Sequence, residues 1–334
     1  MKQRETREGV GGTVSDRDLI RLVAELYYIR DIRQPEIAAL TGFSVSKVSR
    51  LLAQARDAGV VHFSIEPPAE NRPALAGELA DRFGVEVEIT PGREADPVTA
   101  ARVCGLGAAE AVVRALPATG TVGVAGGYTL DSVIAGLPRL ERPGLRIVPV
   151  VGGWDPRTPH LDTNELVRRL GERLGASVRL LHAPGMLDSE STKDALLADS
   201  GVAETTRYWG TLDLAIVGLS GGPLARPGYR TVMDRLDEPG RQRLVALNVV
   251  ADLAGHLFRE DGQFVEDEWS RRTISIALDA LRKVPRVMAI AAGSNKVHAV
   301  LGALRTGYLH VIVTDRTTAE GVMRLADQQV AGGR

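Results

Sequence analysis

One stretch of the chain places short polar and cationic side chains at helical spacing, where they could bond to DNA bases and neutralise phosphates. It runs from Gln34 to Ile65 and reads QPEIAALTGFSVSKVSRLLAQARDAGVVHFSI. At about 100° per residue, its second half sorts into an apolar side and a polar side. Small polar and cationic side chains on a helix suit base edges and phosphates in a major groove. The residues that we expect to contact DNA are Gln34, Ser44, Ser46, Lys47, Ser49, Arg50 and Gln54.

The same pattern also fits a protein–protein module, because any small three-helix unit has one apolar face and one polar face. The local charge is modest, since Lys47, Arg50 and Arg56 outnumber only Asp57 on the second helix. Affinity for DNA grows with the number of phosphates neutralised, so a single copy would bind weakly. Tight binding to DNA would therefore need several copies of this unit, which predicts a homo-oligomer.

A second group of candidate residues lies in glycine-rich loops that follow short apolar strands. Glycine lets the backbone approach a ligand closely, and a helix N-terminus offers free N–H groups to an anion. Lys296 could neutralise a phosphate at such a helix start. We expect effector contacts from these loops and from the end of the last strand, at Gly126, Gly127, Tyr128, Thr129, Gly152, Gly153, Gly218, Ser220, Lys296 and Asp315.

Several kinds of chemistry lack their usual motifs. The chain has no phosphate-binding G-x-x-x-x-G-K-[ST] loop and no G-x-G-x-x-G fingerprint, and Ser220 is not in a G-x-S-x-G elbow. No two of the six histidines have the spacing of metal ligands, and Cys104 is the only cysteine. We therefore expect no cofactor, no metal and no catalytic residue.

The composition is typical of a soluble globular protein. The 334 residues are 44% hydrophobic and 25% charged, with a net charge of −1. Near-neutral charge argues against a protein that coats nucleic acid, so any DNA contact must come from a local patch. No apolar run approaches the roughly 18 residues that a membrane span needs. We expect no membrane association and a cytoplasmic location.

The elements that must position these residues form two domains. Residues 1–14 are polar and are expected to be disordered, 15–66 to form a winged helix-turn-helix with Val60–Ile65 as the wing strand, and 67–73 to be a linker. From 74 to 330, short apolar strands alternate with helices, which predicts a mainly parallel sheet in an α/β domain. The predicted strands are Val85–Ile89, Gly120–Val124, Arg146–Val150, Ser177–Leu181, Leu212–Val217, Val287–Ala291 and Val311–Thr314. The predicted helices are Ala74–Phe83, Pro97–Leu116, Asn164–Leu174, Asp188–Asp199, Arg271–Lys283 and Lys296–Arg305.

The chain resembles bacterial transcriptional regulators of the SorC family, which are related to the sugar-sensing branch of the DeoR group. The resemblance covers nearly everything after the first 14 residues. It is carried by LYYIRDIRQPEIAALTGFSVSKVSRLLAQARDAGVV, GVAGGYTL, VPVVGG, LLHAPGMLDSE, LDLAIVGL, VADLAGHLF and AIAAGSNKVHAVLGALRTGYLHVIVTD. It implies an effector domain with the fold of ribose-phosphate isomerase and glucosamine-phosphate deaminase. It also implies a sugar-phosphate effector, a tetramer on double-stranded operator DNA, and repression that the effector relieves.

The resemblance also implies roles for single residues. The loop Gly126–Thr129 would receive the phosphate, although it departs from the family at its first and third residues. The loop at 152–153 would contact the sugar backbone, and Asp252 would take sugar hydroxyls. Lys296 matches the lysine at the phosphate end, whereas Asp315 fits a structural role as well as a ligand contact.

Two other functions stay open at this point. A sugar-phosphate isomerase or deaminase that carries a helix-turn-helix would need a base over the sugar carbonyl, for which Asp252 and His182 are candidates. Neither residue lies in a motif typical of catalysis, and fold does not imply function. A pure interaction module is the third alternative, against which the glycine loops at one sheet edge argue. The sequence favours a DNA-binding regulator controlled by a small phosphorylated sugar or related carbohydrate, and not an enzyme.

Overall fold

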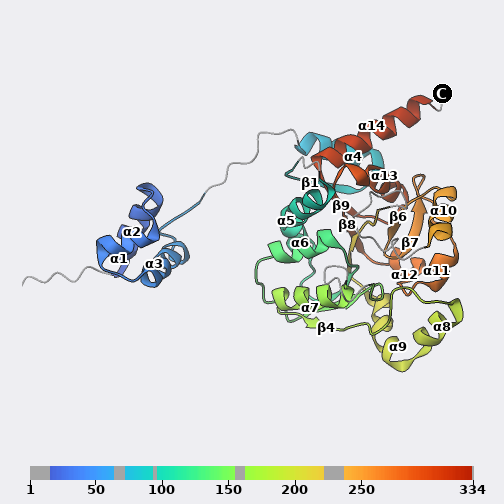
Figure 1. Cartoon of the computed structure of the whole chain (residues 1–334), viewed down its shortest axis with the longest axis horizontal. Coiled ribbons are helices and arrows are strands. Elements are labelled where there is room, and N and C mark those ends of the chain that lie inside the picture. Colours follow the sequence, from blue (N-terminus) through green and yellow to red (C-terminus); the bar gives the residue numbers. More distant parts are fainter. Residues whose placement is uncertain (1–15, 64–71, 93–95, 155–161, 222–236, 333–334) are drawn as a thin grey trace, which may run out of the picture. The chain divides into compact units, whose positions relative to one another are not determined.

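The computed structural model of the chain describes residues 16–63, 72–92, 96–154, 162–221 and 237–332. The chain divides into two compact units, Met1–Glu70 and Asn71–Arg334, which we take one at a time (Figure 1).

The N-terminal unit is a bundle of short helices around a small apolar core. Its elements are α1 (Asp16–Ala24), a turn of π-helix (Glu25–Ile29), α2 (Gln34–Thr41) and α3 (Val45–Asp57). The buried side chains of the core come from all three α-helices: Val23, Ile37, Ala38, Val48, Leu51 and Leu52. The apolar side predicted for the second helix of the motif is therefore the side that packs.

The turn between α2 and α3 has the geometry that a helix-turn-helix requires. Gly42 ends α2 with φ 72°, a left-handed conformation that side chains with a Cβ rarely adopt. Ser44 then caps α3, since its hydroxyl accepts a hydrogen bond from the Lys47 N–H at 3.2 Å.

The predicted wing strand is wrong over the residues that the structure describes. Residues 60–63 form bends and irregular chain, and Ile65 lies outside the described residues. The N–H groups of Val60 and Val61 both donate to the Ala55 carbonyl, at 2.8 and 3.1 Å. These bonds close the end of α3, so they occupy donors that a strand ladder would need. The expected disorder of residues 1–14 and most of the predicted linker also lie outside the described residues.

The second unit is built on a parallel sheet of seven strands in the order β1-β9-β8-β5-β2-β3-β4. All seven correspond to predicted strands: β2 has the predicted bounds, and the ends of the others differ by at most three residues. The strands are β1 (Glu86–Thr90), β2 (Gly120–Val124), β3 (Leu145–Pro149), β4 (Ser177–Val178), β5 (Leu214–Gly218), β8 (Arg286–Ile290) and β9 (Val311–Asp315).

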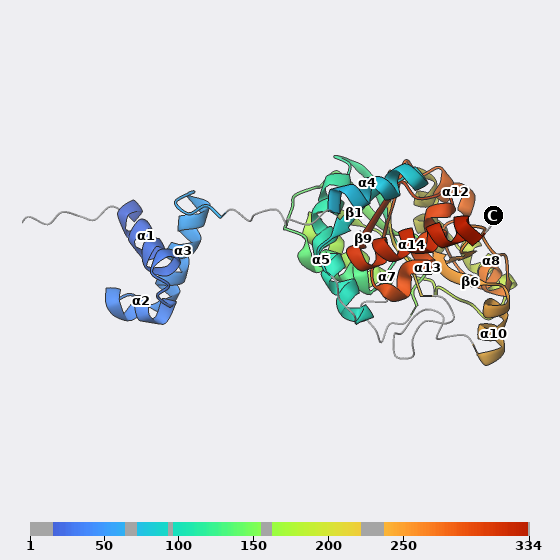
Figure 2. The same ribbon diagram turned by 90° about the horizontal axis from the view of Figure 1, so that it is seen from above.

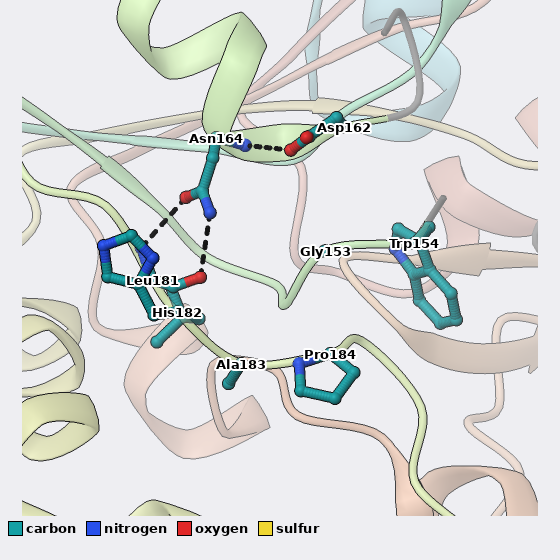
Figure 3. A pocket seen from close by; sticks show the side chains of 8 residues that line it. All are labelled: Gly153, Trp154, Asp162, Asn164, Leu181, His182, Ala183 and Pro184. Carbon is teal, nitrogen blue, oxygen red and sulfur yellow. Dashed lines mark hydrogen bonds between the residues drawn. The ribbon is translucent and has the colours of Figure 1, made fainter. Parts of the chain in front are cut away.

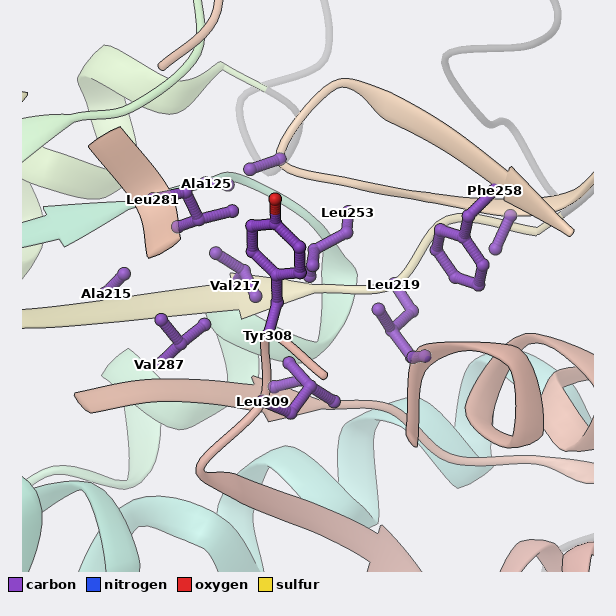
Figure 4. Close-up of a cluster of buried hydrophobic side chains, with 14 of the residues drawn as sticks. Ala125, Ala215, Val217, Leu219, Leu253, Phe258, Leu281, Val287, Tyr308 and Leu309 are labelled. Carbon is purple, nitrogen blue, oxygen red and sulfur yellow. The ribbon is translucent and has the colours of Figure 1, made fainter. Parts of the chain in front are cut away.

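Helices cover both faces of this sheet. Alternate strand residues point to opposite faces, so β3, β5, β8 and β9 each contribute to two cores. One core joins Val122, Ile216 and Met288 to α5, α6 and α7. The other joins Ala215, Val217 and Val287 to helices from the C-terminal part of the chain, and Figure 4 shows part of it around Tyr308. The predicted α/β fold with a mainly parallel sheet is confirmed.

The helices of this unit precede the first strand, lie between strands along the chain, or follow the last strand. Figures 1 and 2 show α4, α13 and α14 beside one another on the second face. The helices are α4 (Arg72–Phe83), α5 (Pro97–Ala115), α6 (Tyr128–Gly136), α7 (Thr163–Leu174), α8 (Glu190–Ala198), α9 (Ser200–Thr206), α10 (Glu238–Ala246), α11 (Glu268–Arg272), α12 (Leu278–Arg282), α13 (Val297–Arg305) and α14 (Arg316–Gly332), with 3-10 turns η2 (Arg207–Thr211) and η4 (Ser294–Lys296).

Two features of this unit differ from the sequence prediction. The expected helix Arg271–Lys283 is wrong in its middle, because Ile274 and Ile276 are buried in extended chain and donate to the carbonyls of Gly185 and Val150. A separate antiparallel hairpin was also missed. It pairs β6 (Val249–Leu253) with β7 (His256–Arg259) through a two-residue turn, and Leu253 bridges to Leu219 just beyond β5.

Candidate functional site

The polar face of α3 lies on the surface of the N-terminal unit. Ser46, Ser49, Arg50 and Gln54 are exposed, while Val48, Leu51, Leu52 and Ala55 of α3 are buried. Lys47 is half-buried with its ammonium 3.8 Å from the centre of the Phe43 ring. This arrangement leaves one row of hydrogen-bond donors and acceptors facing solvent, as groove contact requires.

Two of the predicted DNA contacts have a clear local role as well. Ser44 is exposed but caps α3, and its hydroxyl lies 3.0 Å from that of Ser46. Gln34 is the first residue of α2 and is half-buried. Substituting Ser44 would therefore disturb the fold of the unit as well as any contact with DNA.

In the second unit, the loops after β2 and β5 meet at the point where the strand order reverses. A Cβ atom on Gly218 would lie 3.7 Å from the Gly126 carbonyl oxygen, so the two backbones are neighbours. Gly127 has φ 151° and precedes α6, whose first residues are Tyr128 and Thr129. Open α/β sheets bind ligands in the crevice at such a reversal, beyond the carboxyl ends of the strands.

Ser220, Asp252 and Lys296 come together at the same edge. The Lys296 ammonium donates to the Leu219 carbonyl at 2.9 Å, and the side chain is 3% exposed. The Asp252 N–H donates to the Ser220 hydroxyl at 3.0 Å, and the Asp252 Oδ2 accepts from the Gly255 N–H at 2.9 Å. The hairpin β6–β7 thus carries a carboxylate to the end of β5, opposite a lysine from the loop after β8.

Burial dominates the electrostatics of this cluster. It lowers the pKa of Lys296 to about 8, with the charge of Asp252 acting in the opposite direction. Burial also raises the pKa of Asp252, which hydrogen bonds from Ser220 and Gly255 and the charge of Lys296 partly offset. Burial lowers the pKa of His256, whose Nε2 lies 2.7 Å from the Ile276 carbonyl. At neutral pH, Lys296 is therefore a buried cation.

One carboxylate oxygen of this cluster is buried without a hydrogen-bond partner among the described residues. It is Oδ1 of Asp252, whereas Oδ2 is bonded to Gly255. A buried polar atom without a partner costs free energy, and a ligand hydroxyl would supply the missing bond. The cluster therefore offers a cation for an anionic group and an acceptor for a hydroxyl.

Asp315 lies in a different environment, at the end of β9. Its Oδ1 accepts from the Thr318 N–H at 2.9 Å, which caps the start of α14, and from the Gly293 N–H at 3.5 Å. Gly293 is also bonded to Thr318 in both directions, at 2.9 and 3.0 Å. These bonds give Asp315 a structural role, which the sequence left as an equal alternative.

Gly152 and Gly153 lie where two chain segments pack closely. A Cβ atom on Gly152 would lie 2.5 Å from the Pro184 carbonyl oxygen, and the Gly153 N–H donates to the Ala183 carbonyl at 2.9 Å. Gly153 also lines a cavity of about 250 Å³ at the start of α7 (Figure 3). The other lining residues are Trp154, Asp162, Asn164, Leu181, His182, Ala183 and Pro184.

The sequence did not predict that Asn164 lies in the wall of this cavity or that His256 lies beside Asp252. Asn164 holds the wall in place, because its side-chain amide both donates to and accepts from the Leu181 backbone at 2.9 Å. Nothing in local sequence pattern reveals such a contact between segments 17 residues apart. His256, in contrast, follows the Ala254-Gly255 turn, whose two apolar flanks are a weak hairpin signal.

Neither a metal site nor a membrane span was found in the described part of the chain. No group of three or more histidine, cysteine, aspartate or glutamate side chains is placed there to hold a metal ion. None of the helices described has the length and apolarity that a bilayer crossing requires.

Comparison with known proteins gives matches along most of the chain. The family model described as "Putative sugar-binding domain" matches residues 68–324. The sorbitol operon regulator of Klebsiella pneumoniae is 28% identical over 315 residues, which are 92% of this chain and 98% of that protein. The crystal structure of that full-length regulator, SorC, superposes with a TM-score of 0.70 and covers 93% of this chain and 100% of its own.

Two further relatives have other names. The erythritol catabolism regulatory protein EryD of Brucella abortus is 26% identical over 314 residues, covering 92% of this chain and 97% of that protein. The transcriptional regulator LsrR of Klebsiella pneumoniae is 27% identical over 332 residues, covering 96% and 98%.

Proposed function

Because the chain belongs to the SorC family of transcriptional regulators with its sugar-binding domain, we propose that it is a DNA-binding regulator whose operator affinity is set by a small carbohydrate. The observation that carries this proposal is the union, in one chain, of the α2–α3 motif with a domain of this family. Two relatives that match more than nine-tenths of the chain are named as a sorbitol operon regulator and an erythritol catabolism regulatory protein.

The DNA contact is assigned to the exposed face of α3. Ser46, Ser49 and Arg50 would reach base edges and phosphates, and the start of α3 would lie near the phosphate backbone. The modest charge of this face supports binding by an oligomer, and we propose a homotetramer on operator DNA.

The effector site is assigned to the crevice at the strand reversal, where a phosphorylated sugar fits the chemistry of the residues present. The glycine backbone at 126–127 and the start of α6 suit a phosphate, which the Lys296 ammonium would neutralise. The unpartnered oxygen of Asp252 would accept from a sugar hydroxyl. Gly218 and Ser220 line the same edge.

An enzymatic role has less support. His182 is exposed and lines the cavity beside α7, whereas Asp252 is held by the backbone of its own hairpin. An isomerase or deaminase needs a base and an acid on one substrate, and these two residues lie in separate environments.

The test is a thermal-shift screen of the full chain against phosphorylated and free sugars, followed by operator binding with each hit. We expect a sugar phosphate to raise the unfolding temperature and to change the affinity for DNA. A stabilising sugar that leaves DNA affinity unchanged would refute the coupling, and turnover of the hit would refute the non-enzymatic assignment.

A further inference from the structure

Three arginine side chains gather around one tyrosine at the β4 edge of the sheet, away from the glycine loops that receive the proposed effector. The Arg146 guanidinium carbon lies 4.7 Å from the centre of the Tyr208 ring, and that of Arg207 lies 5.2 Å from it. Arg179 directly follows β4, the strand paired with β3, and its Nη1 donates to the Val178 carbonyl at 3.2 Å. Its charge contributes to lowering the pKa of Tyr208. The three come from β3, from the residue after β4 and from η2, so the fold and not one helix assembles them.

These arginines lack the acidic partners that such residues usually have. Neither Arg146 nor Arg179 forms an ion pair within 4.0 Å among the described residues, and Arg207 reaches Glu204 only at 4.0 Å on an exposed surface. The Nε of Arg146 is buried and has no acceptor in the described part of the chain. Gathered cations repel one another, so a nearby anion would stabilise them.

The backbone that carries this cluster is firmly held. The Trp209 indole N–H donates to the Pro149 carbonyl at 2.8 Å, which fixes η2 against the end of β3. The Thr205 hydroxyl donates to the Leu180 carbonyl at 2.8 Å, and the Arg179 N–H donates to the Ile147 carbonyl at 3.0 Å. Ligand affinity benefits from such preorganisation, because less conformational entropy is lost on binding.

We propose that Arg146, Arg179 and Arg207 form a second binding site, specific for a phosphate-type oxyanion and separate from the effector crevice. The planar guanidinium group presents several N–H donors in a geometry that matches two phosphate oxygens at once. The Tyr208 ring is the platform for two of the three groups, and its hydroxyl lies 3.5 Å from Nη2 of Arg207.

Isothermal titration of the full chain with pyrophosphate at low ionic strength tests the site. We expect saturable binding that Arg207→Gln and Arg146→Gln each weaken by about tenfold or more, because each removes charge-assisted hydrogen bonds. The matched control is Arg168→Gln on α7, since Arg168 is an exposed arginine already paired with Glu165 and Glu172. Binding that is absent in the wild type, unchanged in Arg207→Gln or equally weakened in Arg168→Gln would overturn the proposal.

Ionisation of Tyr208 gives a second readout that does not depend on the stability of the variants. The hydrogen bond from Arg207 and the charges of Arg146, Arg207 and Arg179 hold the pKa of Tyr208 below its ordinary value. An oxyanion on the arginines would raise that pKa, which a spectrophotometric tyrosinate titration measures, with Tyr208→Phe identifying the signal. No change on adding pyrophosphate would contradict the proposed site.

The phosphate could belong to a free compound or to a DNA backbone, and a parallel titration distinguishes the two sources. A duplex of random sequence is added to the wild type and to Arg207→Gln. Equal duplex affinities assign the site to a free phosphate compound, whereas weaker binding by the variant assigns it to the backbone. Lys283→Met, at an exposed lysine outside both sites, should leave pyrophosphate binding within about twofold of the wild type.

Discussion

Replacing Lys296 by methionine removes a buried positive charge while keeping most of the length of the side chain. The Leu219 carbonyl loses its donor, which costs about 1–3 kcal/mol when the acceptor stays buried. Asp252 also loses the nearby cation that offsets its own burial. Methionine carries no charge, so the variant no longer has the cost of burying an ammonium group away from water. This gain offsets part of the loss, and we expect the free energy of unfolding to fall by about 2–4 kcal/mol.

The decisive comparison is a double-mutant cycle with Asp252→Asn. The amide keeps an acceptor for the Gly255 N–H but carries no charge. If the two charges support each other, Asp252→Asn should be less costly in the Lys296→Met background than in the wild type, by about 1–3 kcal/mol. Costs that simply add would refute the coupling of the two residues.

Urea unfolding followed by tryptophan fluorescence suits this measurement. The three tryptophans of the chain, Trp154, Trp209 and Trp269, are all buried in one core of the α/β unit, so the signal reports on that unit. Lys283→Met is the matched control, since Lys283 is exposed on the same unit and should shift the midpoint little.

Three further predictions concern DNA binding, pH and packing. Arg50→Ala should weaken operator binding by about 1–3 kcal/mol in a fluorescence anisotropy assay, whereas Arg21→Ala, on the exposed part of α1, should not; equal affinities would remove Arg50 from the interface. Affinity for an anionic effector should fall as the pH rises through about 8, because Lys296 is charged below its pKa and neutral above it; a titration that is flat from pH 7 to 9 would separate Lys296 from the effector. Gly152→Ala should lower the unfolding temperature, because its Cβ would lie 2.5 Å from a carbonyl oxygen, at a cost of about 1–3 kcal/mol. Gly153→Ala should be tolerated, because the nearest atom to its Cβ would be 3.9 Å away. Equal effects of the two substitutions would contradict the packing described for this loop.

The parallel sheet was predictable because its strands are continuous apolar runs, each followed by a turn and a helix. Val122 and Val124 face one core, and their neighbours in β2 face the other side of the sheet, so nearly the whole strand is buried. A strand buried on both faces consists of apolar and small residues, and this run is visible in the sequence. The segment around Ile274 and Ile276 misled the prediction, since six apolar residues between charged ends fit a helix as well as an extended chain. Only pairing with the Val150 and Gly185 backbones decides between the two, and such pairing is not local.

The candidate site was partly predictable for a similar reason. Lys296 and Ser220 follow strands, so the edge at which they lie follows from the topology of a parallel sheet. Asp252 was assigned through family resemblance, because the hairpin that positions it was not recognised. The arginine cluster around Tyr208 could not be anticipated, since its members are separated by up to 61 positions in the printed sequence and meet only in the fold.

The position of β9 within the sheet has a consequence for how the protein is made. Among the strands that the structure describes, β1 comes first along the chain and pairs only with β9, and β9 also completes the pairing of β8. During synthesis, more than two hundred residues must therefore leave the ribosome between β1 and its hydrogen-bonding partner. The helix-turn-helix has only local contacts and can fold early, whereas the sheet stays open at two strand edges until β9 emerges. Nascent α/β chains should accordingly depend on chaperones over that interval, and a chain cut before residue 311 should aggregate.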